Sequence, residues 1–168
     1  MPPVRSEPPE PDPFDENEFR VWRGFLRTHR AVTDELSRRL ERSHDVTLLH
    51  YGVLITLVTA PDRRLRMTDL ADRVLVSPSG MTRAISRLGD QGLVKREQDP
   101  GDRRSFIVRL TSLGLTRLRE AQVTHHASVR ELLFHGLEAD DLRRLAAIYD
   151  GALAEAAVPS EANASLPG

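Results

Sequence analysis

Apolar residues recur at intervals of three to four positions along most of the chain, which is the spacing of amphipathic helices. The pattern predicts a long helix over residues 15–43. A second helix should begin after Thr47 and end before Pro61, and because it is apolar nearly all round we expect it in the core. Two more helices are expected, one from Thr111, its N-cap, to about residue 134, and one over residues 139–156.

The first long helix carries more apolar positions than the core of one small domain usually needs. Phe19, Trp22 and Leu26 recur at helical spacing, and Phe25 and Val32 lie on a further face. We expect part of this helix to pack against a second subunit, since twofold homodimers are the commonest oligomers. The alternative is a long helix that crosses its own domain.

Two shorter helical patterns lie a few residues apart in the middle of the chain. The first should begin at Thr68, whose hydroxyl is a good N-cap. The second has a sharper start, because Ser77 can cap it and Pro78 stands at the first helical position, where a missing N–H costs nothing. A glycine, Gly89 or Gly92, is expected to end it. Its apolar stripe consists of Met81, Ala84, Ile85 and Leu88.

Two strand patterns follow the second short helix. Residues 93–98 and 105–110 are apolar-rich runs with β-branched side chains, and residues 99–102 supply turn chemistry between them. Residues 63–66, before the helix pair, are expected to form a basic loop. The order helix, turn, helix, strand, turn, strand is typical of a winged helix-turn-helix, which lays one helix in a DNA major groove and a basic loop beside it. An ordinary surface helix would have a similar polar face, and the two strands favour the DNA-binding interpretation.

Charge is distributed unevenly along the chain. The 168 residues carry a formal net charge of −1, yet residues 61–109 hold 11 Arg and Lys against 7 Asp and Glu, a balance of +4. A basic middle in an acidic frame suits a polyanionic partner at one face. The chain has no cysteine, which excludes a disulfide framework and a thiol-based redox switch.

The two ends differ in composition from the rest. Residues 1–14 are rich in Pro and acidic side chains and are expected to form a disordered arm, and residues 158–168 a disordered tail. The arm lacks the apolar run of a signal peptide, and no stretch approaches the ~20 apolar residues of a membrane span, so a cytoplasmic protein is expected. Between the ends we distinguish residues 15–60 as dimerisation and core helices, 61–110 as the DNA-binding region and 111–157 as C-terminal dimerisation helices.

Catalytic chemistry is not evident in the sequence. There is no Gly-rich phosphate loop, no nucleophile elbow and no pair of carboxylates in an evident cleft. Asp140 and Asp141 open a helix, where they more simply serve its dipole. We therefore expect no enzyme and no cofactor. A further alternative is a winged helix that binds protein without DNA, which should expose apolar residues in place of Arg83 and Arg87.

Five short motifs occur together between residues 18 and 156. They are Leu70-Ala71, Thr82-Arg83-x-Ile85-x-x-Leu88, Gly92-Leu93-Val94, Asp102-x-Arg104 and Leu110-Thr111-x-x-Gly114. In combination they resemble the MarR (multiple antibiotic resistance regulator) family. The resemblance implies a mainly α protomer of six helices with a small β-hairpin wing, in a triangular homodimer whose base is formed by the N- and C-terminal helices.

The same resemblance implies a transcriptional regulator that binds a pseudo-palindromic operator in double-stranded DNA. Most members of the family are repressors, so repression is expected here. Half-sites should lie about one helical turn apart, ~34 Å. In the wing, Arg104 would enter the minor groove, Arg103 would contact phosphate, and Asp102 would orient Arg104 by a charge-assisted hydrogen bond. The residues expected at the major groove are Ser77, Ser79, Thr82, Arg83 and Arg87.

Family members commonly respond to small aromatic or anionic effectors, which would shift the separation of the reading helices. Candidate pocket residues here are Trp22, His29, His50 and Tyr51, for which plain core or interface packing is the alternative. A zinc-responsive regulator of the same fold is a second possibility. No compact histidine cluster with ligand spacing supports it, so no metal site is assigned. The histidines weighed for it are His29, His44, His50, His125 and His126.

Overall fold

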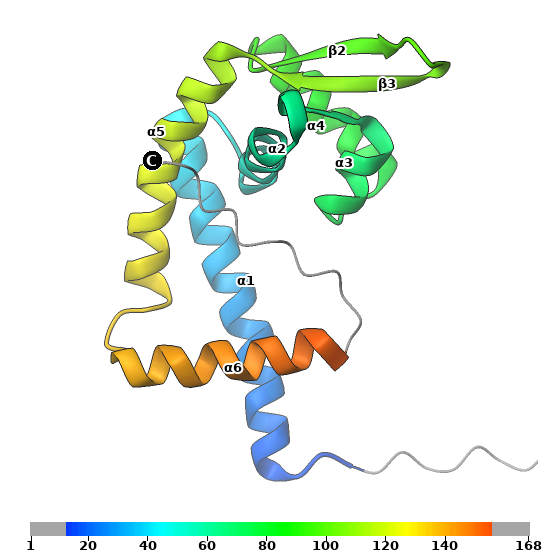
Figure 1. Ribbon diagram of the computed structural model, residues 1–168. Coiled ribbons are helices and arrows are strands. Elements are labelled where there is room, and N and C mark those ends of the chain that lie inside the picture. Colours follow the sequence, from blue (N-terminus) through cyan, green and yellow to red (C-terminus); the bar gives the residue numbers. More distant parts are fainter. Residues whose placement is uncertain (1–12, 156–168) are drawn as a thin grey trace, which may run out of the picture. The chain divides into compact units, whose positions relative to one another are not determined.

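The computed structural model describes residues 13–155, apart from the side chains of residues 103, 104 and 155. The chain divides between Ala31 and Val32 into two compact units, which are described separately. The elements, coloured along the chain in Figure 1, are α1 (Glu16–His44), α2 (Leu48–Thr59), the 3₁₀ helix η1 (Pro61–Arg63), β1 (Arg64–Arg66), α3 (Met67–Arg73), α4 (Pro78–Asp90), β2 (Val94–Asp99), β3 (Asp102–Leu110), α5 (Ser112–Leu132) and α6 (Ala139–Glu155).

The six α-helices predicted from the sequence are confirmed. Most of the predicted disordered arm, residues 1–12, and the predicted tail, residues 158–168, lie outside the described residues. Pro13 and Phe14, at the end of that arm, are exposed and belong to no helix or strand. Within the described range, no helix combines the length and the apolar character that crossing a membrane requires.

Side-chain caps fix the starts of three helices. Thr47 Oγ1 accepts the N–H of His50 at 3.0 Å, and His50 Nδ1 accepts the N–H of Thr47 at 3.3 Å. This is a capping box in which histidine stands where Glu or Gln is usual. The hydroxyls of Ser77 and Thr111 cap α4 and α5, as predicted.

The segment before α3 departs from the prediction. Residues 64–66, expected in a loop, form the strand β1, and α3 begins directly after it at Met67 with Arg66 at the N-cap. Thr68 is therefore inside the helix and is not its cap. A three-residue strand is too short to show an alternating pattern, and it forms because β3 offers a free edge to its backbone groups.

The wing is a three-stranded antiparallel sheet in the order β1-β3-β2. The predicted hairpin is confirmed: β2 and β3 lie side by side (Figure 1) and pair from Val94↔Leu110 onwards. The register shifts between Gln98 and Asp99, at the end of the hairpin. The sequence-based expectation of two strands was thus one strand short.

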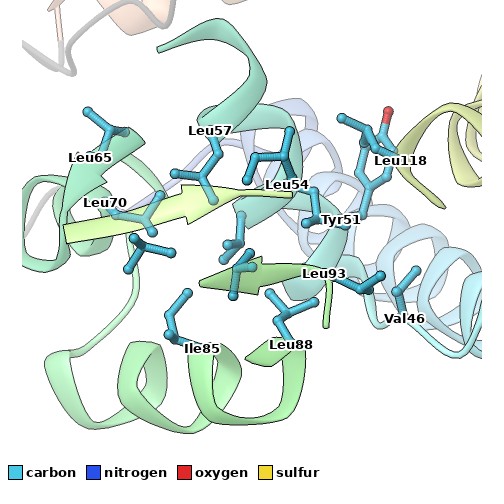
Figure 2. Close-up of a cluster of buried hydrophobic side chains, with 14 of the residues drawn as sticks. Val46, Tyr51, Leu54, Leu57, Leu65, Leu70, Ile85, Leu88, Leu93 and Leu118 are labelled. Carbon is cyan, nitrogen blue, oxygen red and sulfur yellow. The ribbon is translucent and has the colours of Figure 1, made fainter. Parts of the chain in front are cut away.

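The core of the second unit is built around α2, as its apolar pattern predicts. Val53, Leu54 and Leu57 of this helix are completely buried. Figure 2 shows side chains around Leu54 and Leu57 that come from β1, α3, α4, the turn before β2 and α5, namely Leu65, Leu70, Ile85, Leu88, Leu93 and Leu118. Because close-packed interiors deform little, this core gives α4 a rigid support.

Large apolar side chains stay exposed in both units. In the first unit, the beginning of α1 exposes Phe19, Trp22, Phe25 and Leu26, with exposed fractions of 45–49%. Phe25 stacks against both Trp22 and His29, at centroid distances of 6.0 and 6.1 Å. In the second unit, α6 exposes a comparable set, namely Leu142, Ile148, Tyr149 and Leu153.

Candidate nucleic-acid interface

Helix α4 presents a polar face opposite a buried one. Met81, Ala84, Ile85 and Leu88 are at most 3% exposed and join the core, as predicted. At the other end from Pro78, the N–H of Gly92 donates to Gly89 O and that of Leu93 donates to Leu88 O, both at 2.9 Å. This is a Schellman cap, and Gly92 supplies the left-handed residue that it needs, with φ of 71°. The helix is therefore fixed at both ends.

The hydroxyls at the start of α4 are close together. Ser77 Oγ accepts the N–H of Gly80 at 3.2 Å and lies 3.3 Å from Ser79 Oγ. Thr82 Oγ1 donates to Pro78 O at 2.9 Å. All three side chains, which were predicted for the major groove, are gathered on the exposed side of one helix. A hydroxyl can donate to one group and accept from another, so these local bonds leave capacity for a base edge or a phosphate.

The two arginines of α4 lie in different surroundings. Arg83 is exposed and has no ion pair with the residues that the structure describes. Arg87 lies about one turn further along and its Nη2 is 3.3 Å from Asp45 Oδ1, in the turn between α1 and α2. The predicted reading residues are thus brought onto one helix, but Arg87 already has an acidic partner.

A buried carboxylate organises the end of the wing. Asp99 is 5% exposed; its Oδ2 accepts from Arg66 Nε at 2.8 Å, and its Oδ1 accepts the N–H of Gly101 at 2.9 Å. The side chain thereby ties the hairpin turn to β1 at the point where the register shifts. Sequence reasoning missed this role of Asp99 and Arg66. The Asp-Pro-Gly signal indicated a turn but not the strand that would contact it.

Other wing residues also have partners. Asp102 Oδ2 accepts from Ser105 Oγ at 2.6 Å. The expected contact of Asp102 with Arg104 falls outside what is described, as do the side chains of Arg103 and Arg104 themselves. On the paired strands, the guanidinium of Arg96 lies 3.5 Å from the centroid of the Phe106 ring, a cation–π contact that sequence reasoning also missed.

The four candidate pocket residues fall into two pairs. Trp22 and His29 belong to the first unit, where both stack on Phe25. His50 and Tyr51 are neighbours on α2 and are 5% and 7% exposed. His50 forms the capping box, and Tyr51 stacks on His125 of α5 at 4.4 Å. Packing and capping therefore account for the second pair.

An open groove lies between α5 and the second half of α1. Arg39 crosses it: its guanidinium contacts Glu131 at 2.7 and 2.9 Å and Glu35 at 2.8 Å. The bond to Glu131, followed by that to Glu35, raises the pKa of Arg39. Arg42 is more exposed and lies 3.7 Å from Glu35. The groove is lined by Glu35, Arg39, Arg42, Ser43, Val123, Thr124, Ala127 and Ser128.

The histidines weighed for zinc do not gather. Among residues 13–155, no three His, Asp or Glu side chains lie close enough together to hold a metal ion. His44 Nε2 is 2.8 Å from Thr124 Oγ1, and His125 and His126 meet edge to face at 5.8 Å.

His50 of the capping box has a shifted pKa. Burial, followed by the positive charge of Arg87, lowers the pKa of His50 from its ordinary 6.5, and the carboxylates of Glu41 and Asp45 offset this only in part. The unfolded chain then takes up a proton at higher pH than the folded chain does. The contribution to stability is complete above pH 6.5 and is lost as the pH falls below it.

We therefore expect the thermal unfolding midpoint to be lower at about pH 5.5 than at about pH 7.5. The variant His50→Gln should reduce this difference, because its amide oxygen can accept the same N–H without titrating. An equal difference in the variant would assign the pH dependence to other groups, such as His125, whose pKa is also lowered by burial and by His126.

Comparison with known proteins identifies the fold and the family. A model of the MarR family matches residues 44–105. Sco3205, a MarR family transcriptional regulator from Streptomyces coelicolor crystallised in complex with DNA, is 34% identical; the match covers 92% of this chain and 96% of that chain, with a TM-score of 0.81. AbsC, from the same family and organism, is 31% identical over 88% of this chain and 96% of that chain, with a TM-score of 0.75.

The transcriptional regulator YkoM of Bacillus subtilis gives the same result from sequence. It is 28% identical over 130 residues, which are 77% of this chain and 82% of YkoM. Similarity of this extent and level means that the chain belongs to the MarR family of winged helix-turn-helix, DNA-binding transcriptional regulators, and not to a family of enzymes.

Proposed function

We propose that this protein binds a pseudo-palindromic operator as a homodimer, with α4 of each protomer in the major groove and each wing over an adjacent minor groove. One observation carries the proposal: the exposed side of α4 holds hydroxyls and arginine, while its other side is immobilised in the core. The DNA complex of the similar regulator Sco3205 supports the choice of partner. In this arrangement residues 61–110 are the DNA-binding region, and residues 15–60 and 111–157 supply the core and the dimer contacts.

The roles of individual residues follow from their chemistry. Ser77, Ser79, Thr82 and Arg83 contact base edges and phosphates in the major groove, and Arg87 contributes from the next turn of the helix. In the wing, Arg104 enters the minor groove, Arg103 contacts phosphate and Asp102 supports Arg104. The ion pair between the buried Asp99 and the exposed Arg66 holds the wing in place for this purpose.

The dimer rests on apolar surface that a single protomer leaves exposed. Tyr149 and Leu153 of α6 are each 46% exposed, and Ile148 is 65% exposed. Large exposed apolar side chains such as these would suit a protein–protein contact. Two copies related by a twofold axis would present two α4 helices to one duplex, which matches a palindromic site.

Selection from a random-sequence duplex library tests the proposal. We expect the recovered sequences to contain an inverted repeat whose half-sites are centred about ten base pairs apart. Recovery of no common sequence at low ionic strength, or of a motif without twofold symmetry, would contradict it.

Arg104→Ala is expected to weaken binding to the selected duplex by about 1–3 kcal/mol, the usual contribution of a good specific contact. Dissociation constants from fluorescence anisotropy give the value, with circular dichroism as a check that the variant is folded. Replacing the A·T pairs under the wing by G·C should weaken DNA binding by the parent protein and leave binding by the variant nearly unchanged. The reason is that the narrow minor groove of A·T-rich DNA favours arginine. Unchanged affinity of the folded variant would remove Arg104 from the interface.

We further propose that the protein represses transcription and that a small aromatic or anionic effector releases it from DNA. The groove between α1 and α5 is the candidate site for such a ligand. It is lined by Arg42, which offers a positive charge, and by the apolar side chains of Val123 and Ala127. Trp22, His29, His50 and Tyr51 stay the alternative contacts. Titration of the DNA complex with benzoate, and with benzyl alcohol as the uncharged control, measures release. Release by neither compound would remove this class of effector.

A further inference from the structure

The turn between α1 and α2 is bonded directly to the C-terminal end of α4. Gln91 Nε2 lies 2.8 Å from Asp45 Oδ2 and 2.8 Å from Asp45 O, and Arg87 Nη2 lies 3.3 Å from Asp45 Oδ1. Asp45 itself has a left-handed backbone, with φ of 54°, which aspartate tolerates better than most residues. Two side chains of α4 thus converge on one residue that is more than forty positions away in sequence.

The same turn is fastened to α5 through the preceding residue. Arg117 Nη1 donates to His44 O at 2.5 Å, and His44 Nε2 lies 2.8 Å from Thr124 Oγ1. His44 and Asp45 are adjacent, so α5 and α4 are joined through a single peptide unit. The covalent and hydrogen-bonded path between these two helices is therefore short.

The contributions of Gln91 and Arg87 are unequal. The Arg87–Asp45 pair is exposed, with side-chain exposures of 56% and 68%, and exposed ion pairs contribute little. Gln91 is the C-cap residue of α4 and is half-buried. The hydrogen bonds fix the orientation of the Gln91 amide. If the amide were reversed, its oxygen would face Asp45 Oδ2 and Asp45 O, which are both acceptors. Gln91 is accordingly the main contact and Arg87 the secondary one.

We propose that Asp45, Gln91 and Arg87 form a clamp that fixes the angle at which α4 is presented to DNA. The proposal rests on the function proposed above and adds the residues that position the reading helix. In this account Gln91 and Asp45 are positioning residues that do not touch DNA. Arg87 takes part in the clamp through its ion pair with Asp45, in addition to the contribution to the major groove proposed for it above.

The clamp has a geometric consequence for a twofold dimer. Two α4 helices held at a fixed angle fit DNA with one separation of half-sites. Helices whose angle can vary bind DNA with several separations. The decisive readout is therefore affinity as a function of half-site spacing, measured on duplexes in which base pairs are added to or removed from the centre of the selected site. A loss of folded protein alone would lower every affinity in proportion and would leave the shape of this profile unchanged.

The first variant to compare is Gln91→Ala, which removes the amide without changing charge. We expect the ratio of affinities for the selected and a scrambled duplex to fall about tenfold, the order expected when a hydrogen bond to a charged group is lost. We also expect the spacing profile to flatten. The matched control is Gly89→Ala on the same helix, where an added Cβ meets nothing within 4 Å, and it should keep the parent's profile.

The second comparison exchanges donor and acceptor. Gln91→Glu faces Asp45 with a second carboxylate and should bind worst, whereas Gln91→Glu combined with Asp45→Asn restores a donor opposite an acceptor. If the two substitutions acted independently, their fold-losses of affinity would multiply. We expect the double variant to bind DNA more tightly than this product predicts, which a simple additive effect of charge near DNA would not produce.

Three outcomes overturn the clamp: an unchanged spacing profile in Gln91→Ala, multiplicative single effects in the double variant, or loss of discrimination at one base pair only. The last would assign Gln91 to a direct base contact and would leave Arg87 only the DNA contact proposed above. These failures are distinct from failure of the proposed function, because a parent protein that selects no palindrome fails before any variant is compared.

Discussion

Replacement of Gly114 by alanine is expected to lower the free energy of unfolding by about 3 kcal/mol, the upper end of the usual cost of overpacking. A Cβ at this position would lie 2.1 Å from Leu93 O and 2.8 Å from Leu110 Cδ1. The carbonyl of Leu93 cannot easily move away, because its oxygen also accepts hydrogen bonds from the backbone N–H and the hydroxyl of Thr111, at 3.1 Å each. The start of α5 and the exit of α4 would have to separate.

Chemical denaturation of the parent and of Gly114→Ala measures this effect directly. Gly89→Ala is again the control, and there the higher helix propensity of alanine should stabilise the protein by a few tenths to about 1 kcal/mol. If Gly114→Ala were as stable as the parent, the close approach of α5 to Leu93 would be wrong.

Tyr149→Glu is expected to separate the dimer and to reduce affinity for the full operator on the order of a thousandfold. A charge at this exposed apolar position of α6 would be buried without a partner in a subunit contact. A single protomer then holds one half-site and loses the gain from a second, linked contact. Sedimentation gives the oligomeric state, and anisotropy with full and half operators gives the two affinities.

Ala147→Glu is the control for this substitution. It introduces the same charge on the same helix, about 200° round its axis from residue 149, at a position that is also exposed. It should leave the oligomeric state and the affinity near those of the parent. A dimer that survived Tyr149→Glu would move the subunit contact away from this face of α6.

The helices of this protein were predictable because their signals are local. Thr47, Ser77 and Thr111 cap the helices that they precede, and the stripe of α4 follows from spacing alone. β1 was missed because three residues show no period and depend on the edge of β3. Gly114 could be named only as part of a motif, since a sequence gives no indication that Leu93 O lies against its α-carbon.

The candidate site divides in the same way. The polar face of α4 could be predicted from the chain, because residues three and four apart share one side of a helix. The carboxylate of Asp99, the ring of Phe106 beneath Arg96 and the contact of Asp45 with Gln91 could not. Each of these contacts joins segments that are distant in sequence. Whether such a side chain binds DNA or supports a DNA-binding residue depends on its burial and on the direction in which it points.

The proposed function places two protomers with matching helices and wings on one side of a duplex. Hydroxyl-radical footprinting of the selected duplex, with sedimentation of the same complex to count protomers, measures this most directly. We expect two protomers per duplex and protection on one face in segments about one helical turn apart. One protomer per duplex, or protection without that periodicity, would contradict it.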